Sequence, residues 1–94
     1  MDVMNIFKGT QMYKSEIFER AMETRTKVRF YYNLHEEIIA PYFIFTEEDG
    51  TKALYGKSNG DKKVMKYDFE RIINIRLLPN EHFIPIIPIS KLIN

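Results

Sequence analysis

Near residue 26 the spacing of hydrophobic residues along the chain changes from a helical to a strand period. From Tyr13, apolar residues recur every four positions, at Ile17 and Ala21, while charged side chains fill the opposite side. This spacing predicts an amphipathic helix of about three turns. Residues 1–12 have a weaker pattern and contain a glycine, so we expect them to form a flexible arm.

The chain after the helix has the alternation of half-buried strands. Val28, Phe30 and Tyr32 alternate with more polar positions, which is the period of a strand with one face in the core. Pro41 marks an edge or a bulge in a later strand, and Pro79 is expected to end the last one. The expected strands are residues 27–32, 37–45, 51–57, 62–67 and 71–78. Five strands at this spacing after one helix predict a small, mainly β domain that forms a barrel or a sandwich.

This strand assignment predicts which apolar side chains share one core. They come from alternating strand positions and from one face of the helix. The expected core residues are Ile17, Phe18, Ala21, Phe30, Tyr32, Leu54, Ile73 and Ile75.

Residues 84–94 differ in composition from the rest of the chain. Pro85 and Pro88 lie among isoleucines, so this segment is expected to be an extended apolar tail. Such a run is poorly tolerated in water unless it is covered. It therefore either packs across its own domain or docks on another chain, and we expect a homodimer through residues 84–94.

The overall charge limits what the chain can bind. With 14 basic and 13 acidic residues the net charge is +1, so only a local basic surface could attract a polyanion. The chain has no cysteine, which removes disulfides and thiolate metal sites. It has neither a signal-peptide pattern nor a run of about 20 apolar residues. A cytoplasmic protein without a membrane partner is expected.

Two local basic surfaces are expected, one on the first strand and one on the hairpin of the third and fourth strands. Arg29 and Tyr31 share the face opposite the core side chains, and a guanidinium beside a phenol ring suits a phosphate or a stacked base. The simpler alternative is a solvated strand face. Lys66 belongs to a lysine cluster with Lys57, Lys62 and Lys63, which could face a polyanion or could only protect a sheet edge from aggregation.

Catalytic and metal-binding signatures are missing from the sequence. A metal site requires further ligands at suitable spacing, such as a partner four residues away, and neither His35 nor His82 has them. There is no glycine-rich phosphate loop, and no serine has a base nearby in sequence. We therefore expect a protein that is not an enzyme and that needs no cofactor or metal.

Several segments resemble those of the WYL domain, a bacterial regulatory module. The matching segments are 27–32, Pro41-Tyr42, Glu70-Arg71-Ile72 and Phe83, within a resemblance that runs from Ile17 to Phe83. Where family members carry the tryptophan, tyrosine and leucine of the family name, this chain has Lys52-Ala53-Leu54 and keeps only the leucine.

The resemblance implies a five-stranded Sm-like (Src-homology-3-like) barrel with one N-terminal helix over residues 13–83. The family is usually attached to a helix-turn-helix domain, senses small ligands or nucleic acid, and takes part in transcription regulation. No such domain fits in the residues before the first strand, so a free-standing member is expected. Arg71 is carried over from the family as a ligand-facing or structural arginine.

The sequence therefore predicts a non-enzymatic WYL-like module that binds nucleic acid or a small anionic, nucleotide-like ligand. The expected contacts are Arg29, Tyr31, Lys66 and Arg71. The alternative is a protein-interaction or dimerisation module that acts through its apolar C-terminal tail.

Overall fold

One long helix precedes five strands in the computed structural model, which describes residues 3–61 and 63–84. The elements are α1 (Val3–Thr24), β1 (Thr26–Tyr32), β2 (His35–Thr46), β3 (Lys52–Ser58), β4 (Met65–Asp68), the 3-10 helix η1 (Phe69–Arg71) and β5 (Ile72–His82). The expected tail from residue 85 onward, and the dimer assigned to it, lie outside the described residues.

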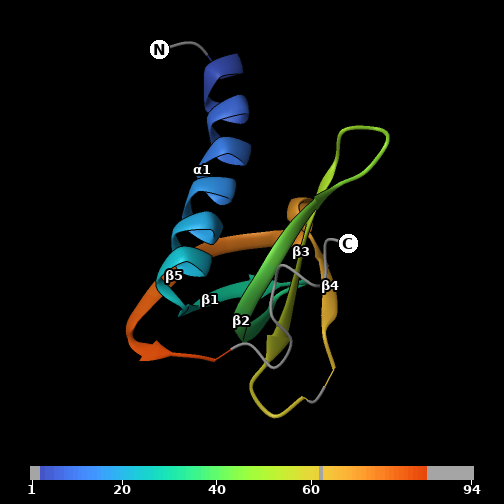
Figure 1. Ribbon diagram of the computed structural model, residues 1–94. Helices are drawn as coiled ribbons and strands as arrows, with labels where there is room; N and C mark the ends of the chain where they lie inside the picture. The colour runs from blue at the N-terminus through green and yellow to red at the C-terminus, as the bar shows by residue number, and fades with distance from the viewer. Residues whose placement is uncertain (1–2, 62, 85–94) are drawn as a thin grey trace.

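The five strands form one antiparallel sheet in the order β4-β3-β2-β1-β5. Figure 1 shows the sheet strongly bent, with α1 packed beside it and the β2–β3 hairpin extending away from the body of the domain. The expected class, mainly β with one N-terminal helix, is confirmed. The sheet is not closed into a barrel, however, because the four residues of β4 pair with β3 and the chain then enters η1.

Two element boundaries differ from the sequence-based expectation by four residues or more. The helix begins at Val3, so residues 3–12 of the segment expected to be a flexible arm are helical, and Gly9 does not interrupt the helix. Extending an existing helix costs far less than nucleating one, which lets a weakly patterned segment continue it. At the other end, β5 runs past Pro79 to His82. Lys27 pairs with Leu78 while Thr26 pairs with His82, so Pro79 lies in a bulge that needs no donor from it.

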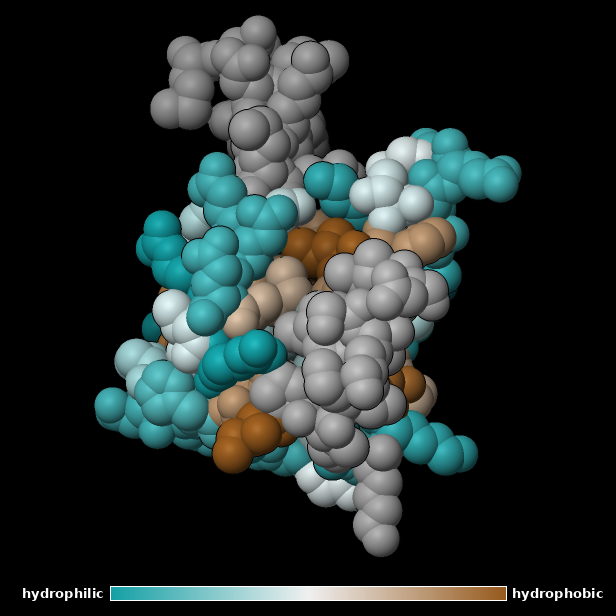
Figure 2. All heavy atoms as spheres, viewed as in Figure 1, coloured by the Kyte–Doolittle hydropathy of each residue, from teal (hydrophilic) through white to brown (hydrophobic). Residues whose placement is uncertain are grey.

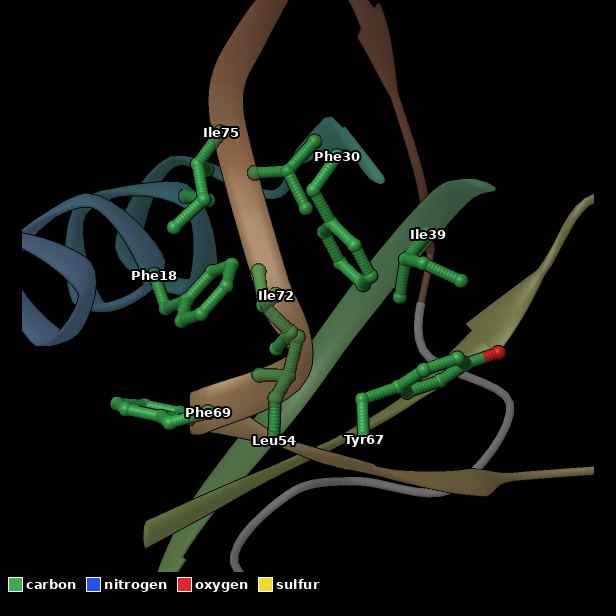
Figure 3. Close-up of a cluster of buried hydrophobic side chains, with 10 residues drawn as sticks. Phe18, Phe30, Ile39, Leu54, Tyr67, Phe69, Ile72 and Ile75 are labelled. Carbon is green, nitrogen blue, oxygen red and sulfur yellow. The ribbon is translucent and has the colours of Figure 1, made fainter. Parts of the chain in front are cut away.

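Aromatic rings from the helix, the sheet and η1 form the centre of the core (Figure 3). The ring of Phe18 lies 6.0 Å from that of Phe30 and 5.4 Å from that of Phe69, both in tilted or edge-on arrangements that aromatic pairs prefer. Tyr67 packs edge-on against Phe30, and burial raises the pKa of its phenol to about 12. Tyr67 therefore remains neutral at physiological pH.

Most of the expected core residues lie where the pattern put them. Phe18, Ala21, Phe30, Leu54 and Ile75 are buried, and Ile17 and Tyr32 pack against them from partly buried positions. The prediction for Ile73 is wrong, since 48% of its surface is exposed.

A bulge in β5 explains the exposure of Ile73. Tyr31 pairs with Ile73 and Arg29 pairs with Arg76, so two residues of β5 stand opposite the single residue Phe30. Asn74 occupies the bulge with φ 56°, a left-handed conformation that asparagine tolerates better than most residues. The extra residue shifts the alternation by one position. Ile72 and Ile75, three apart, therefore both reach the core.

Candidate functional site

On β1, β3 and β5, the sheet face turned away from the core carries four basic side chains, which we call the basic face: Lys27, Arg29, Lys57 and Arg76. On β1, Lys27 and Arg29 alternate with the buried Val28 and Phe30, and so point away from the core as the sequence predicts. Tyr31 follows on the same face and is half-buried.

Arg29 stands directly opposite Arg76 in the pairing of β1 with β5. Directly opposed residues of an antiparallel pair project on the same side, so two positive charges meet across the ladder. The acid nearest Arg29 is Glu36, at 3.8 Å between Nη1 and Oε2, which is too long for a hydrogen bond. The Nε of Arg29 is buried and has no hydrogen-bond partner in the described part of the chain. The positive charge of this pair is thus only partly compensated.

Two lysines extend the basic face across the sheet. Val28 pairs with Ile39, which places Lys27 beside Ala40, and Ala40 in turn pairs with Lys57. The ammonium of Lys27 donates to Oδ1 of Asn59 at 2.9 Å. Both lysines line a small hollow of about 190 Å³ next to the rings of Tyr42 and Phe83. Those rings lie 6.0 Å apart, and Asp61 also lines the hollow, which therefore combines two ammonium groups with aromatic surface and one carboxylate.

Lys66 lies apart from the basic face and is compensated by acids. It sits on β4, with β3 and β2 between it and β1. Its ammonium contacts Glu47 at 2.7 Å and Asp68 at 3.9 Å. The hydrogen bond to Glu47 raises the pKa of Lys66, so the ammonium stays charged while it is paired with this carboxylate. Of the expected cluster, Lys63 is exposed and Lys62 lies outside the described residues.

Arg71 lies at the end of η1, where it is exposed. It precedes Ile72, which pairs with Tyr32 of β1. Arg71 is therefore next to the end of β1 that carries Tyr31. The structure thus groups Arg29 with Tyr31, leaves Arg71 near the same strand end, and places Lys66 on β4, where Glu47 and Asp68 compensate its charge.

The expected contact set omits three members of the basic face: Lys27, Lys57 and Arg76. The place of Arg76 was the hardest to foresee. Its position opposite Arg29 depends on β5 pairing with β1, and on the bulge at Asn74 that sets the register. The sequence carries a signal for neither feature, because strand order is a property of the whole sheet. Lys27 and Lys57 could have been added by alternation from Arg29 and Tyr55, had the pairing of β1, β2 and β3 been known.

Residues 3–61 and 63–84 contain neither a metal-binding group of side chains nor a membrane-spanning helix. No three His, Cys, Asp or Glu side chains in residues 3–61 and 63–84 are grouped so that they could hold a metal ion. No helix in this part of the chain is long and apolar enough to cross a membrane.

Comparisons with known proteins give one structural similarity. No family model matches the sequence, and no curated protein matches it. A solved structure, proteasome accessory factor B/C (PafBC) of Arthrobacter aurescens, matches with a TM-score of 0.66 at 14% sequence identity. The match covers 77% of this chain and 12% of PafBC. At this identity the similarity shows a shared fold with a small part of a much longer protein.

Proposed function

We propose that this chain is a non-enzymatic, WYL-like regulatory module that binds an anionic ligand on its basic face. The ligand class is a single-stranded nucleic acid or a nucleotide-like molecule. Two similarities support the regulatory part of the proposal: the resemblance of residues 17–83 to the WYL domain, a regulatory module, and the fold that the chain shares with a part of PafBC, a proteasome accessory factor.

The opposed arginines Arg29 and Arg76 carry the ligand-binding part of the proposal. Like charges directly opposite each other destabilise a sheet, and the single acid beside Arg29 does not reach hydrogen-bonding distance. A phosphate between the two guanidinium groups would relieve this repulsion and accept bidentate hydrogen bonds from either group.

The neighbouring side chains suit the remaining parts of such a ligand. Tyr31 offers a ring for base stacking on the same face, and aromatic stacking tolerates any base. Lys27 and Lys57 continue the positive surface towards the Tyr42–Phe83 hollow, where further phosphates of a strand would lie. Arg71 is a candidate contact at the Tyr31 end, whereas Lys66 is held by carboxylates and is expected to contribute little.

Titrations of the full chain at two salt concentrations test this function. Labelled single-stranded DNA, single-stranded RNA and a mononucleotide are followed by fluorescence anisotropy. Each phosphate contact adds roughly 0.7 to the salt slope for a single strand, so four cations predict a slope of up to about 3. Absence of binding to all three probes, or binding that does not weaken with salt, would reject an anion-binding basic face.

The second candidate function is a protein-interaction or dimerisation module that acts through residues 84–94. Ile84, the last described residue, is 91% exposed, and the sequence beyond it is rich in isoleucine. Apolar docking depends little on ionic strength, in contrast to polyanion binding. The same two salt concentrations therefore separate the two functions.

A further inference from the structure

A groove of about 790 Å³ runs between α1 and the edge strand β5, away from the Lys27–Lys57 hollow. On the helix side it follows one stripe, Tyr13, Ile17 and Arg20, which spans two turns or about 10 Å. On the sheet side it follows residues 72–77 of β5. Ligand sites in proteins are concave, mostly apolar and of about 300–1,000 Å³, and this groove falls in that range.

Apolar side chains that are accessible to a ligand form most of the groove wall. Tyr13 is 58% exposed and Ile73 is 48% exposed, and between them Ile17 and Leu77 are half-buried. Ile73 is available here because the bulge at Asn74 takes it out of the core. The bulge that keeps Ile73 out of the core therefore supplies an exposed aliphatic side chain to the groove.

All charged residues that line the groove are basic: Lys14, Arg20 and Arg76. Lys14 is the most buried of them, and its ammonium donates to the backbone carbonyl of Phe69. An ammonium has three donors, so a hydrogen bond to one carbonyl leaves it able to donate to a ligand. Burial lowers the pKa of Lys14, while Glu70 acts in the opposite direction. An anion in the groove would offset the cost of this buried charge.

The form of β5 argues against an added β-strand as the occupant. The bulge at Asn74 and the proline at position 79 interrupt the regular backbone pattern that a pairing strand would need. Recognition at this edge must therefore rely on side chains: an aliphatic wall and a set of cations. Both features fit a small molecule with an apolar body and one anionic group.

We propose that the α1–β5 groove binds a small amphiphilic anion, with an aliphatic or aromatic body against Ile17, Ile73 and Leu77 and a carboxylate held by Arg20. The groove and the basic face share Arg76, but the contacts assigned here, Arg20, Ile17, Ile73 and Leu77, take no part in the proposed function. A medium-length fatty acid has an apolar chain that matches the two-turn length of the groove, and it has one carboxylate for Arg20 to bind.

Octanoate, titrated into the full ¹⁵N-labelled chain and followed by amide chemical shifts, tests the proposal. The expected result is saturable binding with shifts concentrated in residues 13–20 and 72–77. Inorganic phosphate and octylammonium serve as comparisons for charge alone and for the opposite charge. Both should bind at least about tenfold more weakly than octanoate, since each lacks either the apolar or the anionic part. Equal binding of octanoate and octylammonium, or shifts elsewhere in the chain, would overturn the proposal.

Two variants with exposed side chains test the residues named. Arg20→Gln removes the anion partner and Ile73→Ser removes the aliphatic wall, and each should weaken octanoate binding by roughly tenfold. Lys57→Gln is the matched control, because it lies on the basic face outside the groove, and it should bind octanoate as the parent does. Both groove variants should still bind the oligonucleotide. Parent-like octanoate affinity in Arg20→Gln and Ile73→Ser, with unchanged melting temperatures, would contradict the assignment.

Discussion

Arg29 of β1 and Arg76 of β5 face each other across an antiparallel ladder, so the sheet holds two like charges at directly opposed positions. Opposed pairs of this kind change stability by about 0.2–1 kcal/mol. The arrangement is unfavourable for the unliganded fold and favourable for an anion that bridges the two groups. A trade-off between stability and binding follows from this geometry.

Arg76→Gln is predicted to stabilise the free protein by about 0.2–1 kcal/mol, because it removes the repulsion with Arg29. The same change should weaken binding of the single-stranded oligonucleotide. Urea unfolding and anisotropy titrations measure the two effects. Arg76→Lys, which keeps the charge, is the control and should leave stability close to that of the parent. A loss of stability in Arg76→Gln would show that this side chain supports the fold instead.

Phe30→Ala is predicted to destabilise the domain by about 3–5 kcal/mol, because it leaves a cavity between Phe18 and Tyr67. Ile73→Ala is the matched control on β5. Its side chain is 48% exposed, so its effect should stay within about 0.5 kcal/mol. Urea unfolding of both variants measures the difference. Comparable losses in the two would mean that the register of β1 against β5 is wrong.

The stability of the parent should rise relative to Lys14→Met as the pH increases from neutrality towards 10.5. Burial lowers the pKa of Lys14 below its ordinary value of 10.5, so the folded state releases this proton before the unfolded state does. Below the lowered pKa both states are charged, and the folded state pays for burying the charge. Above it, the unfolded state binds more protons and stability increases with pH.

Melting temperatures of the two proteins across this pH range measure the effect. Subtracting the variant removes the contribution of the other titrating groups, which both proteins share. A difference in melting temperature that does not change with pH would show that Lys14 has an ordinary pKa in the folded state.

Removal of residues 85–94 should give a folded monomer if the tail mediates the expected homodimer. This segment contains four isoleucines and a leucine, enough apolar surface for several kcal/mol at about 25 cal/mol per Å². Sedimentation of the intact and truncated chains at the same concentration measures the change. An intact chain that sediments as a monomer at tens of micromolar would end the dimer proposal.

Local pattern predicted the fold class and most of the core because both depend on which face each residue presents. The alternation around Phe30 and the helical spacing of Ile17, Phe18 and Ala21 are properties of neighbouring residues, and both were confirmed. Tyr13, at the start of the helical spacing, is exposed instead. The prediction for Ile73 was wrong because the left-handed Asn74 forms a bulge between Ile73 and Ile75, so these two residues do not face the same side of the sheet. A left-handed asparagine cannot be told from an ordinary one in the sequence, so the bulge was not foreseeable.

The candidate site was predicted in part, for a related reason. Arg29 and Tyr31 lie on one strand, so alternation alone groups them. Their partner Arg76 comes from a strand about 45 residues later, and its place is fixed by sheet order and register. Lys66 is also positively charged, but it does not lie beside Arg29 and Arg76, because β4 and β5 are at opposite edges of the sheet. The sequence shows which residues are basic, whereas only the pairing of the strands shows which of these side chains lie next to each other.

The most direct test of the basic face compares one oligonucleotide titration across four proteins at a single low salt concentration: the parent, Arg29→Gln, the double variant Arg29→Gln with Arg76→Gln, and Lys66→Gln. Each arginine contact with a phosphate is worth roughly 1.5–3 kcal/mol, or about tenfold or more in affinity. Binding should be weaker in Arg29→Gln, weaker still in the double variant, and parent-like in Lys66→Gln. Parent-like binding in the double variant, or a loss confined to Lys66→Gln, would contradict the proposed basic face.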